Sequence, residues 1–223
     1  MKRLLPVLAV FILSCAAPSE DLDYDAVRQM VPKGKRADEL RERFHIVLYG
    51  SWEDGELSVV AGALEMFPNK DLADLEFYRM PRGPERGGRY DLGRVTVREP
   101  TLDVVLHELG HAVHSRCPAR DRMDDELRAA LPFDSWHSAS SWADGEGGPR
   151  SGFVSPYAAM NVEECVAEAV AAAKLWSRRG RGPVSGIEWS DERFGRVFQI
   201  LDRYGLTDEE DRVEIRKTAK LMR

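Results

Sequence analysis

The sequence predicts an α+β fold, because short segments with strand character and longer segments with helical periodicity follow one another along the chain. Three β-rich segments occur within the first hundred residues. One helical pattern lies between the first two of these segments, the others follow all three, and a long loop without periodicity separates two of them. No internal repeat is visible, and 223 residues suit one domain with a short appendage.

The predicted strands have marked boundaries. The run FHIVLY at 44–49 is followed by Gly50, and the run at 75–80 is followed by Pro81. Residues 90–98 alternate between apolar and polar side chains, which is typical of a strand with one exposed face. We expect this third strand at the edge of the sheet, either open to pairing with an extended peptide or simply kept soluble by its arginines.

The predicted helices carry apolar residues on one face, spaced three or four positions apart. Between two of them lies the segment 132–156, which is rich in Ser, Gly, Asp and Trp. A structureless segment of this length is usually functional; Trp136 and Trp142 either line a cleft or pack locally. The predicted helices cover residues 57–67, 101–117, 161–176, 190–204 and 207–222.

The N-terminus is predicted to be an export signal. Lys2 and Arg3 precede an apolar stretch at 4–13 that is too short to span a bilayer. This stretch runs into Leu-Ser-Cys, which resembles a bacterial lipobox with Cys15 as the lipidated first residue of the mature chain. The alternative is ordinary signal cleavage within 14–17, where small residues alternate.

The resulting organisation is a signal peptide at 1–14, an N-terminal tether at 15–40 and a folded domain at 41–223. Both kinds of cleavage export the chain. With a lipid it is anchored to the bacterial envelope, on the periplasmic or outer-membrane face; without one it is periplasmic or secreted. The net charge of −6 and the absence of a basic, aromatic-interleaved cluster exclude nucleic acid as an expected partner. The sequence indicates no particular oligomeric state.

His107, Glu108 and His111 form an HExxH motif inside the predicted helix 101–117. Four residues advance an α-helix by about 400°, so the two histidines lie on one face, one turn apart. Both imidazoles can then bind one zinc ion, and Glu108 lies beside that face, where it can act on a metal-activated water. The alternative is a chance match on a solvated helix.

Catalytic zinc normally takes three protein ligands, so one must come from elsewhere in the chain. No histidine follows at the metzincin spacing, and His114 points partly off the metal face. A carboxylate of the helix 161–176 is therefore favoured, and Glu164 and Glu168 share one face of that helix. One could bind zinc while the other orients a ligand histidine. The downstream candidates are His114, His137, Glu146, Glu163, Glu164 and Glu168.

A structural role for the same residues is the alternative. Asn161 followed three positions later by Glu164 is also a capping-box pattern, and a carboxylate that binds zinc is not free to cap. Cys165 follows Glu164 directly, and Cys117 follows the HExxH helix. A disulfide between these cysteines and two buried thiols are therefore weighed equally.

Two stretches, VLHELGHAVH at 105–114 and GFVSPYAAMNVEECVAEA at 152–169, together resemble the anthrax lethal-factor-like zinc metallopeptidases, a gluzincin group. The resemblance implies a zincin-like fold, in which a small mixed sheet accompanies the HExxH helix and a second ligand-bearing helix. It implies Glu164 as the third ligand of one zinc ion per chain. It also implies Tyr157 as the donor to the developing oxyanion and Glu168 as the partner of a ligand histidine.

The expected function is therefore that of a zinc-dependent endopeptidase, which hydrolyses peptide or protein substrates with Glu108 as general base. The main alternative is a catalytically inactive, zinc-binding surface lipoprotein that acts as a binding or scaffolding module. A hydrolase that acts on a non-peptide amide, such as cell-wall material, is a further possibility.

Overall fold

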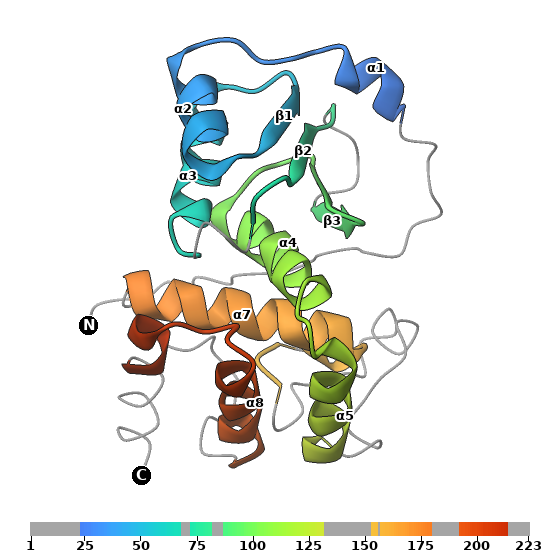
Figure 1. Ribbon diagram of the computed structural model, residues 1–223, viewed down its shortest axis with the longest axis vertical. Helices are drawn as coiled ribbons and strands as arrows, with labels where there is room; N and C mark the ends of the chain where they lie inside the picture. The colour runs from blue at the N-terminus through green and yellow to red at the C-terminus, as the bar shows by residue number, and fades with distance from the viewer. Residues whose placement is uncertain are drawn as a thin grey trace, which may run out of the picture.

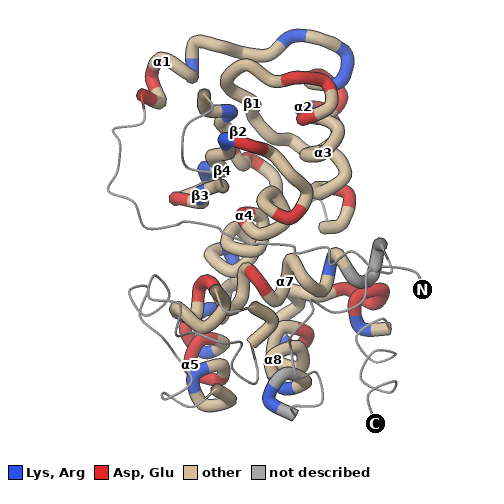
Figure 2. The backbone as a smooth tube through the Cα atoms, turned by 180° about the vertical axis from the view of Figure 1, so that it is seen from behind, with Lys and Arg blue, Asp and Glu red and all other residues tan. Residues whose placement is uncertain are grey.

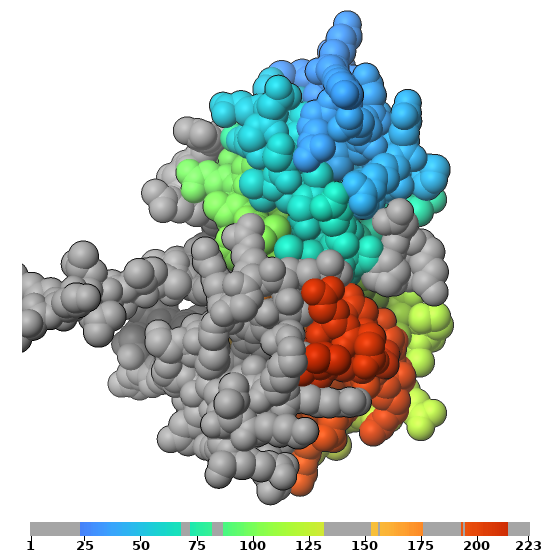
Figure 3. All heavy atoms as spheres, turned by 90° about the vertical axis from the view of Figure 1, so that its left-hand side faces the viewer, coloured from blue at the N-terminus to red at the C-terminus, as the bar shows by residue number. Residues whose placement is uncertain are grey.

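The computed structural model describes residues 23–67, 72–81, 87–131, 153–155, 157–179 and 192–213. A small sheet with its helices forms the upper part of the molecule, and a group of helices forms the lower part (Figure 1). Figure 3 shows the blue-to-green N-terminal elements stacked above the orange and red C-terminal helices. The predicted α+β class, with its small mixed sheet and its HExxH helix, is confirmed. The predicted signal peptide, Cys15 and the two tryptophans of the predicted long loop lie outside the described residues.

The sheet has the strand order β1-β2-β4-β3. Strand β1 (Val47–Gly50) pairs in parallel with β2 (Glu76–Arg79), and β2 pairs in parallel with β4 (Arg94–Val97). Strand β3 (Gly88–Asp91) is antiparallel to β4 and forms one edge of the sheet. The sheet is therefore mixed.

The single strand predicted at 90–98 is wrong, because this segment is part of a hairpin. Leu92 and Gly93 form a two-residue turn between β3 and β4, with φ of 45° and 88°. Positive φ at both central residues defines a type I′ turn, which normally contains Asn or Asp before Gly. Leu92 gives no such signal, so the alternating pattern runs through the turn undisturbed. The predicted edge position belongs to β3.

Helices cover both faces of the sheet, because successive strand residues point to opposite sides. Phe77 packs into the main core, with α2 (Lys35–Phe44) and α3 (Asp54–Leu64), whereas Tyr78 belongs to a second, smaller cluster with α1 (Tyr24–Arg28). Figure 1 shows α1 on one side of the strands and α2 and α3 on the other.

The predicted tether at 15–40 includes folded structure. Helices α1 and α2 begin before residue 41, and Val27, Leu40 and Phe44 are buried against the sheet. The reason is amphipathicity: Ala37, Leu40 and Phe44 recur at helical spacing inside a charged segment. The packed part of the chain therefore starts near residue 24 among the described residues.

The lower part consists of α5 (Arg120–Ala130), α7 (Val162–Arg179) and α8 (Glu192–Arg203), and α4 (Leu102–Ser115) connects it to the sheet (Figure 1). Helix α5 was not predicted, because its charged sequence buries only a few apolar side chains. The predicted helix 207–222 is described only as far as residue 213.

Surface charge and hydropathy show no dominant feature in the described residues. Figure 2 shows acidic and basic residues interspersed over both parts of the molecule. None of the helices that the structure describes combines the length and the apolar character needed to cross a bilayer.

Candidate metal centre

The HExxH motif lies in the buried part of helix α4. Thr101 is its N-cap in extended conformation, following Pro100, and the helix continues to Ser115. Leu106 and Leu109 are fully buried in the core. His107 and His111 lie one turn apart, with their rings 4.7 Å apart at 84°. The sequence-predicted pair is therefore held by a helix whose other faces are packed.

Helix α7 brings the third candidate ligand. The side-chain oxygen of Asn161 accepts a hydrogen bond from the backbone N–H of Glu164, at 2.8 Å. The cap thus uses the backbone of Glu164, while its carboxylate reaches the histidines. The cap and the contact with the histidines do not exclude each other, because they use different atoms of Glu164.

Three potential ligand atoms converge between the two helices. Nε2 of His107 lies 3.1 Å from Nε2 of His111 and 3.1 Å from Oε2 of Glu164, and the remaining separation is 3.3 Å. Tetrahedral zinc with bonds of about 2.0–2.1 Å requires ligand atoms about 3.3 Å apart. The three residues therefore fit the ligand set of such an ion in both chemistry and spacing.

Glu168 holds His107 from the other side. Its Oε1 atom lies 2.7 Å from Nδ1 of His107, and both side chains are buried. With the Nδ1–H donating to this carboxylate, the lone pair of Nε2 is left to face Glu164 and His111. Glu168 is therefore positioned to orient the ring of His107.

The carboxylate of Glu108 is fully buried, and neither of its oxygens has a hydrogen-bond partner among the described residues. Burial raises the pKa of Glu108 to about 7, although the neighbouring His107 and His111 oppose this rise. A carboxyl group with a pKa near neutrality can both accept and release a proton under physiological conditions.

The charges of the ligand residues are coupled. Burial would raise the pKa of Glu164, but hydrogen bonds and charges from His107 and His111 outweigh it and lower that pKa to about 2. Burial likewise lowers the pKa of His107, but Glu164 and Glu168 outweigh burial and raise it well above its ordinary value. The cluster therefore favours a positive charge among its carboxylates, which a proton or a metal cation can supply.

Tyr157 stands beside this cluster. It begins the short 3-10 helix η3 (Tyr157–Ala159), and its ring centroid lies 5.7 Å from that of His107. The backbone N–H of Ala158 donates to Oγ of Ser155, at 3.0 Å, which fixes the turn. The Phe-Val-Ser-x-Tyr-Ala run thus places a phenol next to the candidate ligands.

Gly110, inside the motif, has a role that the sequence did not reveal. A Cβ atom at this position would lie 2.7 Å from Cα of Ala167 and 2.8 Å from its carbonyl oxygen. Contacts that short do not occur, so the missing side chain lets α4 and α7 approach closely enough for their ligands to meet. The sequence shows a glycine between Leu109 and His111, but only the contact with Ala167 in the folded protein explains why a glycine is needed there.

Two of the other predicted candidates, His114 and Glu163, have partners of their own away from the three ligand atoms. Nε2 of His114 lies 2.7 Å from Oδ1 of Asp124, in a buried contact between α4 and α5. Glu163 pairs with Arg120 at 3.0 Å. His137 and Glu146 lie outside the described residues.

The disulfide predicted as one of two alternatives is not formed. Cys117 and Cys165 are both free: Cys165 is buried within α7, and Cys117 is half-buried beyond the end of α4. Burial raises the pKa of the Cys165 thiol to about 12, so it remains protonated. The structure therefore has two free thiols, and Cys165 is buried as the other alternative expected, whereas Cys117 is half-buried.

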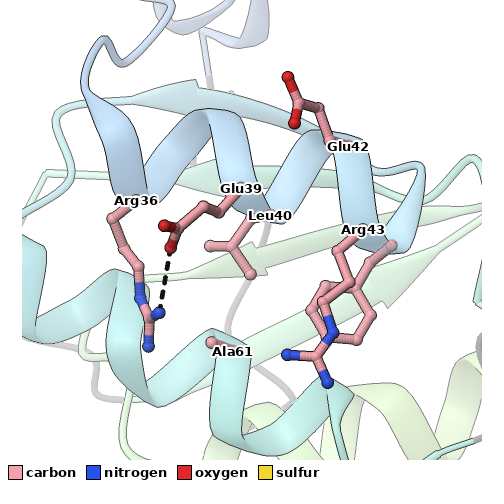
Figure 4. A pocket seen from close by; sticks show the side chains of 7 residues that line it. Arg36, Glu39, Leu40, Glu42, Arg43 and Ala61 are labelled. Atoms are coloured by element: carbon pink, nitrogen blue, oxygen red, sulfur yellow. Dashed lines mark hydrogen bonds and ion pairs between the residues drawn. The ribbon is translucent and has the colours of Figure 1, made fainter.

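A separate cavity of about 380 Å³ lies between α2 and α3 (Figure 4). Leu40 and Ala61 form part of its lining, and Arg36 and Glu39 form an ion pair at its rim. It contains none of the residues of the metal centre.

Comparisons with known proteins add little to this geometry. No protein-family model and no curated protein matches the chain. Among solved structures, the chain is similar to a candidate zinc-binding metallo-peptidase from Bacteroides caccae ATCC 43185, with 13% identity and a TM-score of 0.38 over 86% of each chain. A likeness this distant says nothing about chemistry, so the function has to be inferred from the site itself.

Proposed function

We propose that the protein is a zinc-dependent peptidase, in which His107, His111 and Glu164 hold one zinc ion per chain. The observation that carries this proposal is the convergence of three ligand atoms, 3.1 to 3.3 Å apart, beside the buried carboxylate of Glu108. A structural zinc site would be closed by four protein ligands, whereas three ligands next to an acid–base residue are typical of a catalytic site.

Zinc bound there would polarise the scissile carbonyl and lower the pKa of the attacking water. Glu108 would accept the proton of that water and later deliver it to the leaving amine. Burial brings the pKa of Glu108 to about 7 in the metal-free site, close to the range that suits a general acid–base group. The proton therefore moves through a group that is shielded from bulk solvent.

Tyr157 and Glu168 would assist this step. The phenol of Tyr157, whose ring lies beside His107, would donate a hydrogen bond to the developing oxyanion. Glu168 would keep His107 in the tautomer that presents Nε2. Tyr157 and Glu168 both lie in the stretch 152–169, which resembles the lethal-factor-like group, and this resemblance supports both assignments.

The proposed setting is outside the cytoplasm. The charged and apolar N-terminus supports export, with a lipid on Cys15 anchoring the domain to the bacterial envelope. The substrates are then peptides or proteins that are accessible from that compartment. Replacing Cys15 with Ser should release the protein from the membrane fraction if the anchor is a lipid; unchanged fractionation would favour ordinary cleavage.

The decisive experiment measures zinc content and peptide cleavage together, in the wild-type protein and in Glu108→Gln. We expect one zinc per chain in both proteins, and cleavage of a fluorogenic peptide library by the wild type alone. Removal of a general base alone costs about 10²–10⁴-fold, so Glu108→Gln should lose at least that much turnover.

Other outcomes of this experiment separate the alternatives. One zinc per chain without cleavage by the wild type would favour the inactive, zinc-binding surface module. Absence of stoichiometric zinc would contradict the proposal altogether. Cleavage that Glu108→Gln retains at the wild-type rate would contradict the assigned base.

A further inference from the structure

The edge strand β3 lies directly against Glu108, the proposed general base on α4. A Cβ atom built on Gly88, the first residue of β3, would lie 2.6 Å from Oε1 of Glu108, 2.7 Å from Cγ and 2.9 Å from Cδ. Figures 1 and 2 both show β3 beside α4. The backbone of the strand therefore lies so close to Glu108 that any side chain at position 88 would press on its carboxylate.

The backbone conformation does not require glycine at this position. Gly88 is not among the residues with positive φ, although its neighbour Gly87 is, with φ of 131°. Alanine at position 88 would therefore be free of backbone strain. What glycine contributes here is the absence of a Cβ atom.

Glu108 has no easy way to avoid such a Cβ. The three close contacts run along the side chain from Cγ to the carboxylate, so rotation of the terminal group alone cannot relieve them. The whole side chain is fully buried, which means that any larger movement has to displace neighbouring core atoms. Either the carboxylate or the strand must move.

We infer that Gly88 is a positioning residue for Glu108: its missing side chain lets the backbone of β3 pack on the carboxylate and hold it in place. This inference rests on the proposed function, because the position of Glu108 matters for turnover only if Glu108 transfers the proton. Proton transfer demands hydrogen-bond distances, and a displacement of about 1 Å at a reacting group can cost on the order of 10²-fold in rate.

The first arm of the test measures kinetics in the full-length protein loaded with zinc. We expect Gly88→Ala to retain one zinc per chain and a nearly unchanged KM for a fluorogenic peptide, while kcat falls by on the order of 10²-fold. A merely structural role for Gly88 would lower the amount of folded protein and would leave the kcat of the folded fraction unchanged.

The second arm does not depend on activity. It compares the thermal unfolding midpoint of the metal-free protein with and without Gly88→Ala, in three backgrounds: wild type, Glu108→Gln and Glu108→Ala. We expect the midpoint to fall by at least about 3 °C in the first two backgrounds, because glutamine has the shape of glutamate. The fall should disappear in Glu108→Ala, which lacks Cγ, Cδ and both oxygens.

Gly62→Ala in α3 is the matched control, because a Cβ there would meet nothing within 4 Å. If Gly88→Ala lowered the unfolding midpoint equally in all three backgrounds, the substitution would destabilise the strand itself, and the inference would be overturned. A Gly88→Ala protein with the wild-type midpoint and kcat would also overturn it. If the wild type cleaves no peptide, the proposed function fails, but the unfolding comparison still decides whether Gly88 positions Glu108.

Discussion

The Nδ1 atom of His107 lies 2.7 Å from Oε1 of Glu168, so one hydrogen bond joins α4 to α7 directly behind the candidate zinc ligands. The bond fixes both the tautomer and the ring orientation of His107 before any metal arrives. It also gives the carboxylate of Glu168, which is buried, a polar partner.

Loss of this hydrogen bond should weaken metal binding. Glu168→Ala leaves all three candidate ligands in place but frees the ring of His107, so we expect zinc affinity to fall about 10–100-fold. Competition with a chelator of known affinity measures the effect. The control is Glu163→Ala on the same helix, since Glu163 pairs with Arg120 on the surface. Equal affinities in both variants would show that Glu168 does not orient His107.

Gly110→Ala should destabilise the protein although it places the best helix former inside a helix. The helix alone would gain about 1 kcal/mol from this change. The new Cβ, however, meets the backbone of Ala167, which cannot rotate away, and overpacking of this kind costs about 1–3 kcal/mol. Denaturant unfolding measures the net change in the free energy of unfolding. Zinc titration should also show weaker binding.

The sign of the change in the free energy of unfolding is the test for Gly110→Ala. Gly62→Ala, in α3, has open space around the new methyl group and should raise the free energy of unfolding. An increase of similar size for Gly110→Ala would mean that the close approach of α4 and α7 does not depend on this glycine.

Lys174 should be essential for the stability of the lower helices. Its buried ammonium donates to Asp208 at 2.9 Å and to Asp211 at 2.5 Å, and Asp211 is fully buried. Lys174→Met would remove the buried ammonium from both carboxylates, and breaking a buried pair costs about 3–5 kcal/mol. Urea unfolding should show this loss, whereas Lys35→Met, at an exposed position, should change stability little. Similar midpoints for the two variants would contradict the prediction.

The two free thiols should react at different rates. In a Cys15→Ser background, a thiol reagent should modify the half-buried Cys117 in the native protein and Cys165 only after unfolding. Burial raises the pKa of Cys165 to about 12, so almost no thiolate is present at neutral pH. Mass spectrometry of the native, labelled protein identifies the modified residue. A protein that takes up no label until it is reduced would instead carry a disulfide.

The parts of this structure that depend on local periodicity could be predicted from the sequence. His107 and His111 face the same way because four residues make about one helical turn, and the segment 75–80 is a strand because its apolar run is closed by proline. Glu164 and Tyr157 are far from the motif in sequence, and their place beside it was implied by the resemblance alone, or left as one alternative among several.

The parts that depend on tertiary contacts could not be predicted. The turn at Leu92 lacks the residue types that mark a type I′ turn, so the hairpin was missed. The significance of Gly88 and Gly110 lies in what a Cβ would touch, on elements distant in the chain. Helix α5 has too few apolar residues to show a period, and it is stabilised by contacts such as the one between Asp124 and His114.

The division of tasks within Glu164 has an evolutionary consequence. Its backbone completes the cap of α7, while only its side chain reaches the histidines. Any residue with a backbone N–H can form this cap, so one codon change at position 164 would remove the proposed ligand without removing the cap. A single step could therefore separate a chain that carries the proposed metal site from one that keeps the start of α7 without it.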